Sequence, residues 1–265
     1  MTEEKCPLVL TLSGGGILGY RYTKILPKIQ KHFNIVYAYG TSIGSLVALA
    51  TIYNVDLQEV FNSREFKRLF KLYNFNFAIY AISSKQGLYN DFYLMSAIAK
   101  VMSLCKLPLD ITFKDVPNLC VNACIKGGKI GENKLILYFN SKVNNDILLI
   151  DALYASCCIP GIFPMKSYKG YELFDGGMLE NMIIPKVKNH IGIPMIGIYL
   201  YPIYSGNWII DTFWTNQCIH LIKRAKEHIP IIMLTEFNYN KISNHVLQKF
   251  FSNVKHHYDY LQTCQ

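Results

Sequence analysis

The sequence is poor in acidic residues and lacks the usual marks of a secreted chain. Its 265 residues include 18 Asp and Glu against 27 Lys and Arg, so the formal net charge is +9. It contains no C-x-x-C pair and no N-x-[ST] sequon, and residues 1–5 are too polar for a signal peptide. We therefore expect an intracellular, cytoplasmic and reducing setting, in which the eight scattered cysteines form no disulfide framework.

Long apolar stretches are also lacking. The longest runs, residues 43–53 and 191–204, are too short to cross a bilayer or contain Gly and Pro. Apolar residues nevertheless make up 51% of the chain, which excludes a disordered protein. No linker, repeat or low-complexity tract interrupts a length that suits one α/β domain. We therefore predict a single domain over residues 1–265.

The excess of positive charge indicates an anionic partner. A basic surface attracts lipid headgroups and nucleic acid alike. The chain has no zinc finger, basic zipper or RNP-like aromatic pair, so we favour a membrane surface and expect no nucleic acid. No cluster of His, Cys and Asp has the spacing of metal ligands, and we expect no metal and no other cofactor. None of these patterns indicates an oligomeric state.

The chain is organised around the motif Gly40-x-Ser42-x-Gly44. The apolar and aromatic residues 35–39 predict a strand before it, and the residues after it predict a buried helix that reaches about residue 53. A nucleophile elbow has this form, because the sharp strand-to-helix turn exposes the serine Oγ and crowds any Cβ two residues before or after it. Unrelated loops also match the motif by chance. Its place between a strand and a helix makes Ser42 a candidate nucleophile.

A run of glycines, Gly14, Gly15 and Gly16, follows a predicted strand at residues 8–12 and opens a predicted helix at residues 17–29. Consecutive glycines let backbone N–H groups converge on an anion. A phosphate is one candidate, but G-x-x-x-x-G-K-[ST] is absent and G-x-G-x-x-G is met only loosely. We favour an oxyanion hole beside the serine, with the N–H of Ile43 as a further donor.

A carboxylate motif completes the set. Asp175 ends an apolar run and is followed by Gly176 and Gly177. An Asp-Gly pair on its own predicts a turn between strands. Beside a nucleophilic serine and an oxyanion loop, the carboxylate becomes a candidate general base. The competing base is His190, which follows in the Ser–Asp–His order of the α/β-hydrolases, although most of the histidines lie beside lysines or on polar helix faces.

These three motifs, in this order, resemble the patatin-like phospholipase family. Residues 151–164, which contain Ala-Ser and end in Phe-Pro, are similar to the segment that precedes Asp-Gly-Gly in that family. The resemblance covers about residues 8–185. It implies a three-layer α/β/α fold with a central, mostly parallel sheet. It also implies a catalytic dyad of Ser42 and Asp175 that needs no histidine.

Two positions depart from the pattern of the family. Leu18 stands where the family often has a cation, and Arg21 lies three residues further on. Asn181 matches an asparagine of the family, but Pro185 follows it by four residues instead of two. The departures affect the electrostatics of the oxyanion loop and the loop after the aspartate, and they leave the dyad intact.

Further periodic segments fill in the fold. We predict helices at residues 91–103, capped by Asn90, and at residues 147–158. Strands are predicted at residues 119–125, 134–139 and 195–200. The early alternation of strands and helices predicts a parallel sheet with both glycine motifs at the carboxyl ends of its strands. Two amphipathic stripes predict helices within about residues 207–265 that pack on this part.

Residues 56–80 interleave aromatic and basic side chains. The candidate membrane contacts among them are Arg64, Lys67, Arg68 and Lys71. In one interpretation the segment is a lid or membrane patch, whose rings lie at headgroup depth while its cations meet phosphate. In the other it is an ordinary amphipathic helix whose aromatic side faces the core. The sequence leaves both interpretations open.

We expect a serine hydrolase that cleaves fatty-acyl esters of phospholipid, or of another lipid, through an acyl-enzyme and without calcium. It would attach to membranes peripherally. Two alternatives remain. A transacylase with the same dyad would pass the acyl group to an alcohol or a lysolipid. A non-catalytic membrane-binding protein would keep the fold with a silent site; the intact Ser42 and Asp175 argue against it, and Leu18 argues slightly for it.

Overall fold

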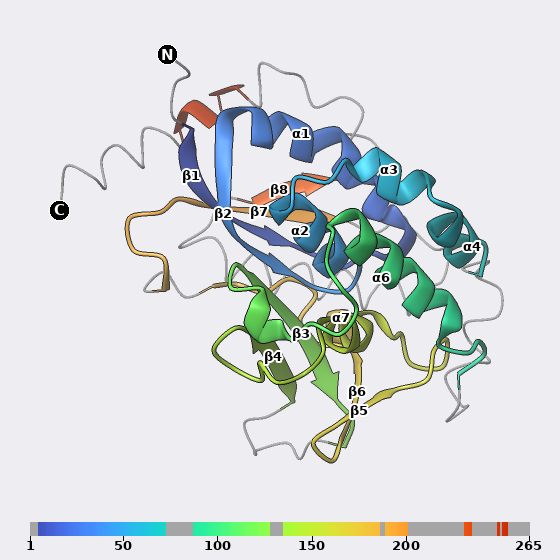
Figure 1. Ribbon diagram of the computed structural model, residues 1–265. Helices are drawn as coiled ribbons and strands as arrows, with labels where there is room; N and C mark the ends of the chain where they lie inside the picture. The colour runs from blue at the N-terminus through green and yellow to red at the C-terminus, as the bar shows by residue number, and fades with distance from the viewer. Residues whose placement is uncertain are drawn as a thin grey trace, which may run out of the picture.

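The computed structural model describes residues 5–72, 87–127, 135–185, 189–200, 231–234, 248–249 and 251–253. Strands and helices alternate at the start of the chain (Figure 1). The strands are β1 (Cys6–Leu12), β2 (Phe33–Gly40), β3 (Leu119–Ile125), β4 (Ile136–Asn140), β5 (Lys166–Tyr168), β6 (Tyr171–Asp175), β7 (Met195–Leu200) and β8 (Ile231–Leu234). The helices are α1 (Tyr22–His32), α2 (Ile43–Ile52), α3 (Leu57–Asn62), α4 (Arg64–Leu72), α6 (Phe92–Leu104) and α7 (Leu149–Cys157), with 3-10 turns η1 (Gly16–Arg21), η3 (Phe113–Asp115) and η4 (Gly176–Met178).

One sheet joins these strands in the order β5-β6-β3-β2-β1-β7-β8, with β4 also paired to β3. The pairs that link β3, β2, β1, β7 and β8 are all parallel. The pairs made by β4, β5 and β6 are antiparallel. The sheet is therefore mixed and mostly parallel, and the loops that follow β1 and β2 lie at the same end of it.

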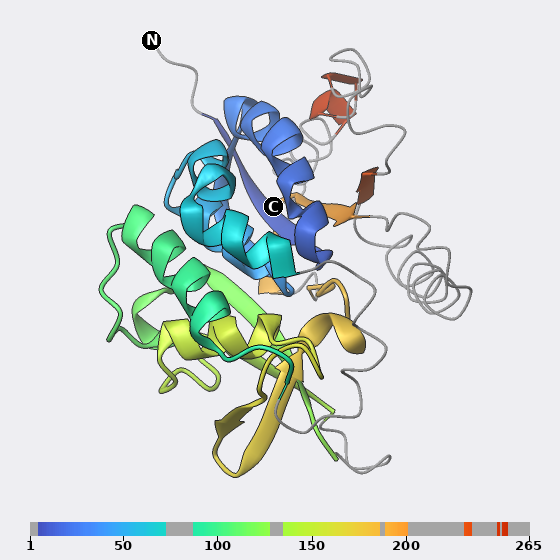
Figure 2. The same ribbon diagram turned by 90° about the vertical axis from the view of Figure 1, so that its right-hand side faces the viewer.

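Strand β3 has three neighbours because two of them share one of its edges. β4 pairs along residues 120–124, whereas β2 pairs with residues 119–121 and β6 with residues 123–125. Each of these two overlaps β4, so both lie on the opposite edge. Because β2 runs parallel to β3 and β6 runs antiparallel, their carboxyl ends point at each other. In Figure 2 the gold β6 rises toward the blue strands from below.

The described helices pack into one main core on one face of the sheet (Figures 1 and 2). Leu8, Leu10 and Leu12 of β1 belong to this core, together with apolar side chains of α1, α2, α6 and α7. The alternate residues face the other way, where Val9 and Tyr39 belong to a smaller cluster. β1 is therefore apolar on both sides, as is typical of strands inside a mostly parallel sheet.

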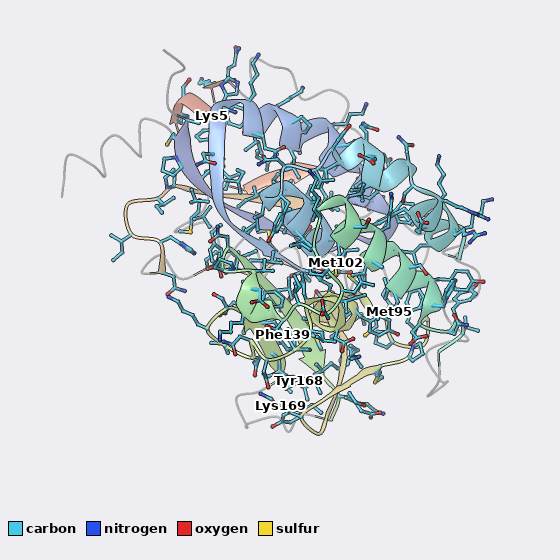
Figure 3. All side chains as sticks on the ribbon, in the orientation of Figure 1. Lys5, Met95, Met102, Phe139, Tyr168 and Lys169 are labelled. Atoms are coloured by element: carbon cyan, nitrogen blue, oxygen red, sulfur yellow. The ribbon has the colours of Figure 1, made fainter. Side chains whose placement is uncertain are left out.

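Helix α2 lies at the centre of the main core. Its residues 43–51 are all buried, which explains why the sequence after the elbow is apolar on every side of the helix. Met102 of α6, which packs against α2, is fully buried, and so is Phe139 of β4 (Figure 3). At the upper end of the molecule in that view, Lys5 Nζ donates to the carbonyl oxygen of Gln30 at 2.7 Å and ties the start of β1 to α1.

Most of the predicted elements are confirmed: the strands at residues 8–12, 35–39, 119–125, 134–139 and 195–200 and the helices after residues 42, 91 and 147. Two details were wrong. The helix predicted over residues 17–29 is split into η1 and α1. Asp91, and not Asn90, is the N-cap of α6, with no side-chain capping bond. The β5–β6 hairpin and β8 were not predicted, and the helices predicted within residues 207–265 lie largely outside the described residues.

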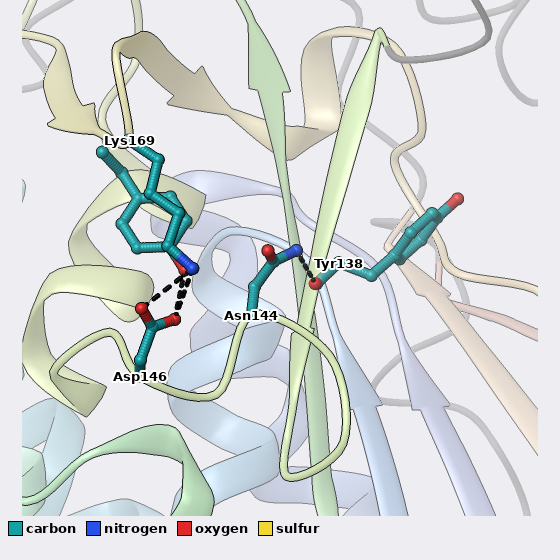
Figure 4. A network of polar contacts seen from close by, with 5 residues as sticks. Tyr138, Asn144, Asp146 and Lys169 are labelled. Atoms are coloured by element: carbon teal, nitrogen blue, oxygen red, sulfur yellow. Dashed lines mark hydrogen bonds and ion pairs between the residues drawn. The ribbon is translucent and has the colours of Figure 1, made fainter.

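The turn of the β5–β6 hairpin is fastened to the loop after β4. Tyr168 OH and Lys169 Nζ donate to Asp146 Oδ1 at 2.6 and 2.9 Å (Figure 4). The hydrogen bond from Lys169 and, to a smaller extent, that from Tyr168 lower the pKa of Asp146. In the same loop, Asn144 Nδ2 donates to the carbonyl oxygen of Tyr138 at 3.0 Å. These exposed contacts guide the path of the loop and add little to the stability of the fold.

Candidate active site

The candidate nucleophile and base meet because two strand ends converge on β3. Gly40, at the end of β2, is paired with Val121, and Asp175, at the end of β6, is paired with Ala123. Only Asn122 separates the two pairing positions. The chain that leaves β2 and the chain that leaves β6 therefore enter the same space, and residues 133 positions apart in the sequence come within hydrogen-bond distance.

Ser42 occupies a strained turn. Its φ of 52° and ψ of −130° are values that residues other than glycine rarely adopt. A Cβ at Gly40 would lie 2.5 Å from the carbonyl oxygen of Gly44, and a Cβ at Gly44 would lie 2.5 Å from that of Ser13. The N–H of Ser42 donates to Oγ of Ser156 at 2.9 Å, which anchors the turn to α7. This geometry is that of a nucleophile elbow, and packing requires both of its glycines.

The serine and the aspartate are in direct contact. Ser42 Oγ donates to Asp175 Oδ2 at 2.6 Å, and Asp175 Oδ1 accepts from the N–H of Gly177 at 2.7 Å. Both side chains are buried. Burial raises the pKa of Asp175 to about 6, although the hydrogen bonds from Ser42 and Gly177 act in the opposite direction. At neutral pH the carboxylate is ionised and close to taking up a proton, as a general base must be.

The glycine loop and the elbow offer backbone N–H groups to an oxyanion. The sequence predicts Gly14 as one donor, and this is wrong, because its N–H donates to the carbonyl oxygen of Asn181 at 2.9 Å. The N–H groups of Gly15, Gly16 and Ile43 donate to no acceptor within the described part of the chain. Uncommitted donors of this kind are what an oxyanion hole uses. These three N–H groups remain the candidates.

Asn181 lies in the loop after the aspartate, and its side chain packs against Gly14 of the glycine loop and against Gly177. Its Nδ2 donates to the hydroxyl of Tyr199 at 3.2 Å, while its Oδ1 is buried without a hydrogen-bond partner among the described residues. A Cβ at Gly14 would lie 2.5 Å from this oxygen, and a Cβ at Gly177 would lie 2.8 Å from it. Glycines at these two positions therefore make room for the Asn181 amide beside the dyad.

A sequence model of the family described as patatin-like phospholipase matches residues 10–186, which is more than half of the chain. The matched stretch begins in β1 and ends just after the loop that follows the aspartate. The chain belongs to the patatin-like phospholipase family. The family resemblance inferred from the three motifs and the segment at residues 151–164 is thus confirmed, together with the α/β fold and its mixed, mostly parallel sheet.

Solved structures of other proteins are similar to the chain in part. VipD from Legionella pneumophila is 14% identical, with a TM-score of 0.47, over 84% of this chain and 54% of VipD. ExoU of the Pseudomonas aeruginosa type III secretion system, in complex with SpcU, is 13% identical, with a TM-score of 0.42, over 97% of this chain and 52% of the other. The patatin-like chain thus spans about half the length of these structures. No curated protein is significantly similar to it in sequence.

His190, the competing base, is held elsewhere. Its Nε2 shares a hydrogen bond of 2.7 Å with the hydroxyl of Tyr39, and its ring lies 4.9 Å from that of Tyr37. Burial lowers the pKa of His190. Among the described residues, no hydrogen bond joins this imidazole to Ser42 or to Asp175. The contact between Ser42 and Asp175 therefore does not involve this imidazole.

The aromatic and basic side chains of α3 and α4 separate onto two sides. Phe61, Phe66 and Phe70 pack against one another toward the core, with Phe61 and Phe66 5.4 Å apart at their ring centres. The core interpretation of these aromatic residues is confirmed, while residues 73–80 lie outside the described residues. The exposed side of α4 carries four cations: Arg64, Lys67, Arg68 and Lys71. No helix in the described ranges is both long and apolar enough to cross a membrane.

Two features of the structure were not apparent from the sequence. Ser156, in the segment before the Asp-Gly-Gly motif, accepts the N–H of Ser42. Arg21, the cation nearest to Leu18, is fully buried at the end of η1. A buried guanidinium is rare in proteins and needs compensation. Its location inside the protein depends on tertiary packing, which local sequence does not reveal.

Proposed function

We propose that the protein is a calcium-independent serine acyl hydrolase that cleaves fatty-acyl esters of phospholipids. The hydrogen bond of 2.6 Å from Ser42 Oγ to Asp175 Oδ2, made on a strained elbow, carries the proposal. Membership of the patatin-like phospholipase family supports a lipid ester as the substrate. The proposed chemistry needs no metal ion, because Asp175 itself activates the serine.

In the acylation half of the reaction, Asp175 takes the hydroxyl proton as Ser42 Oγ attacks the ester carbonyl carbon. The carbonyl oxygen becomes an oxyanion, which the N–H groups of Gly15, Gly16 and Ile43 stabilise. Each such donor contributes on the order of 3 kcal/mol. The N-terminus of α2 carries a partial positive charge, which also stabilises the oxyanion. When this tetrahedral intermediate collapses, the bond between the carbonyl carbon and the lysolipid oxygen breaks. That oxygen takes the proton from Asp175, the lysolipid departs, and the acyl group stays on Ser42.

In the second half, a water molecule gives a proton to Asp175 and attacks the acyl carbon. The new oxyanion uses the same donors as the first. Its collapse releases the fatty acid and returns the proton to Ser42 Oγ. A transacylase would differ only in the acceptor, which would be an alcohol or a lysolipid in place of water. Hydrolysis is the simpler proposal, since it needs no second substrate.

We place the membrane contact on the exposed cations of α4. Phe61 of the adjoining α3 lies close to the elbow: a Cβ at Gly19 would clash with the Ile43 side chain and lie 3.3 Å from a Phe61 ring atom. A basic surface one helix away from the nucleophile would hold the active site near anionic headgroups. Anionic phospholipid is therefore the proposed surface on which the enzyme works.

The deciding experiment measures fatty-acid release from mixed phospholipid vesicles by the wild-type protein and by Ser42→Ala, with a chelator present throughout. We expect release by the wild type and a loss of about a thousandfold or more in the variant. A fluorophosphonate probe should label the wild type and not Ser42→Ala.

The other outcomes separate the alternatives. Labelling of Ser42 with acyl transfer to an added lysolipid, and little free fatty acid, would replace hydrolysis by transacylation. Fatty-acid release that requires calcium would contradict the metal-independent dyad. Absence of labelling and of release from phospholipids and neutral glycerides alike would leave a membrane-binding protein with a silent site.

A further inference from the structure

A single amide side chain lies inside β3, between the two halves of the dyad. All residues of β3 are buried, and Asn122 is the one carboxamide among them. Burying an amide without hydrogen bonds costs several kcal/mol, so a fully buried Asn in a strand is retained only where its bonds are satisfied. Its position is also special, because the pairing of β2 with β3 ends at Val121 and that of β6 begins at Ala123.

Asn122 holds the two loops that carry the reacting groups. Its Oδ1 accepts from Thr41 Oγ1 at 2.9 Å, and Thr41 immediately precedes the nucleophile. Its Nδ2 donates to the carbonyl oxygen of Glu180 at 3.0 Å, in the loop that follows the base. One side chain thus uses its acceptor for the chain leaving β2 and its donor for the chain leaving β6. An apolar residue of the same size would make neither bond.

Close packing at Gly176 and a hydrogen bond from Tyr138 further hold the loop after the base beside Asn122. A Cβ at Gly176, directly after the base, would lie 2.5 Å from Asn122 Oδ1 and 2.6 Å from its carbonyl oxygen. The glycine of the Asp-Gly motif is therefore required by the close approach of Asn122. Tyr138, the β4 residue paired with Asn122, donates through its hydroxyl to Glu180 Oε2 at 2.6 Å. The loop after the base is thus held from two adjacent strands.

We propose that Asn122 is a positioning residue, which sets the distance between Ser42 and Asp175 by fastening both strand ends to one side chain. We assign it no catalytic role, because its side-chain hydrogen bonds go to Thr41 and Glu180 and not to Ser42 or Asp175. The inference rests on the proposed use of the dyad. A displacement of about 1 Å at a reacting group can lower a rate by about a hundredfold, so the loss of either bond should affect the reaction.

The test measures the inactivation of Ser42 by a soluble fluorophosphonate, which separates the first-order rate constant, kinact, from the binding constant, KI. We expect Asn122→Leu and Thr41→Val each to lower kinact by about 10- to 100-fold with KI unchanged. The double variant should be about as slow as the slower single variant, because both substitutions remove the same bond. If Asn122→Leu does not fold, Thr41→Val alone decides.

Thr51→Val is the matched control. It also removes a buried threonine hydroxyl, which donates to the carbonyl oxygen of Val47 in α2, away from the strand ends. We expect it to lower the melting temperature as much as Thr41→Val does and to leave kinact unchanged. Values of kinact within twofold of wild type in both test variants, or an equal loss in the control, would overturn the inference. Wild-type protein that is labelled but hydrolyses no lipid would refute the proposed substrate alone, whereas wild type that is not labelled would overturn both proposals.

Discussion

At neutral pH, Asp175 carries a negative charge inside the protein. Its pKa of 3.8 in an unperturbed chain is raised by burial to about 6 in the folded protein. The folded state therefore binds a proton more readily than the unfolded state. The stability that Asp175 contributes is fully present below pH 3.8 and is lost as the pH rises through about 6. The charge that the chemistry requires thus lowers the stability of the fold.

Asp175→Asn should abolish hydrolysis and raise the free energy of unfolding at pH 7, by up to about 3 kcal/mol. The amide keeps the size of the carboxyl group, can accept from Gly177 and donate to Ser42, and carries no charge. In denaturant unfolding, the difference between variant and wild type should shrink as the pH falls from 7 to 4. Equal stability at pH 7 would contradict a destabilising buried carboxylate.

The same group sets the pH dependence of the rate. Because the base must be ionised, kcat/KM should rise with pH, with an apparent pKa of about 6. The thiols of Cys124, Cys157 and Cys158 lie close to the carboxylate, and burial raises their pKa values, so they stay protonated in this range. The profile is measured as fatty-acid release at constant ionic strength.

His190→Gln is the control for that profile. The imidazole bonds to Tyr39, so the variant should keep its rate within about threefold and show the same rise with pH. Loss of both the rate and the rise in this variant would transfer the role of base to the histidine.

Short motifs predicted the features that depend on local geometry. A serine between two glycines at a strand-to-helix turn is defined within five positions, so the strained elbow at Ser42 could be predicted from the sequence. Gly14 was misassigned because the acceptor of its N–H is the carbonyl oxygen of Asn181, on a segment far away in the chain. Asn122 carried no sign of its role, since a single Asn in an apolar strand matches no motif.

At the scale of elements, α4 presents its cations to solvent and its phenylalanines to the core. Reversing the charge of Arg64, Lys67 and Arg68 to Glu should weaken binding to anionic vesicles by about a hundredfold or more, because each basic residue near the surface contributes about 1 kcal/mol. Vesicle co-sedimentation measures the change. Hydrolysis of a soluble short-chain ester should be unaffected.

A triple reversal on α1 serves as the matched control. Lys24, Lys28 and Lys31 lie on a helix of similar length, and changing them to Glu alters the net charge of the protein by the same amount. If the α4 surface is the contact, the α1 variant should bind more tightly than the α4 variant. Equal losses would mean that overall charge, and not α4, governs attachment.

Elements with strong periodicity were predictable, and short irregular ones were not. α6 buries Leu94, Ala97, Ile98 and Val101 at helical spacing, and β3 is a short continuous apolar run whose length is typical of a buried strand. β5 has only three residues and shows no sequence pattern. The β5–β6 hairpin, which ends at the candidate base Asp175, therefore depends on the pairing of β6 with β3. The 3-10 turn η1 was also unexpected, because a continuous helix was predicted there. It follows the glycine loop, which is bound through the N–H of Gly14 to Asn181 in the loop after Asp175.

At the scale of the whole molecule, the site is a product of sheet register. The motifs indicated that a serine and an aspartate would act together, but not that β2 and β6 would end opposite neighbouring residues of β3. Register between strands far apart in sequence is set by the packing of the entire core, and a shift of one residue would turn each side chain to the other face. Only the folded chain therefore reveals how the dyad is assembled.

The net charge of +9 makes a final prediction about the molecule as a whole. Raising the salt concentration from about 50 to about 300 mM shortens the screening length, and this weakens the summed attraction of many exposed cations to a membrane. Hydrolysis of anionic vesicles should therefore fall by about tenfold or more over this range. Hydrolysis of a soluble short-chain ester should stay nearly constant, because the contact between Ser42 and Asp175 is buried and little screened. Vesicles of zwitterionic lipid serve as the reference surface. An equal fall with all three substrates would mean that salt acts on the dyad or the fold, and attachment through surface charge would then be excluded.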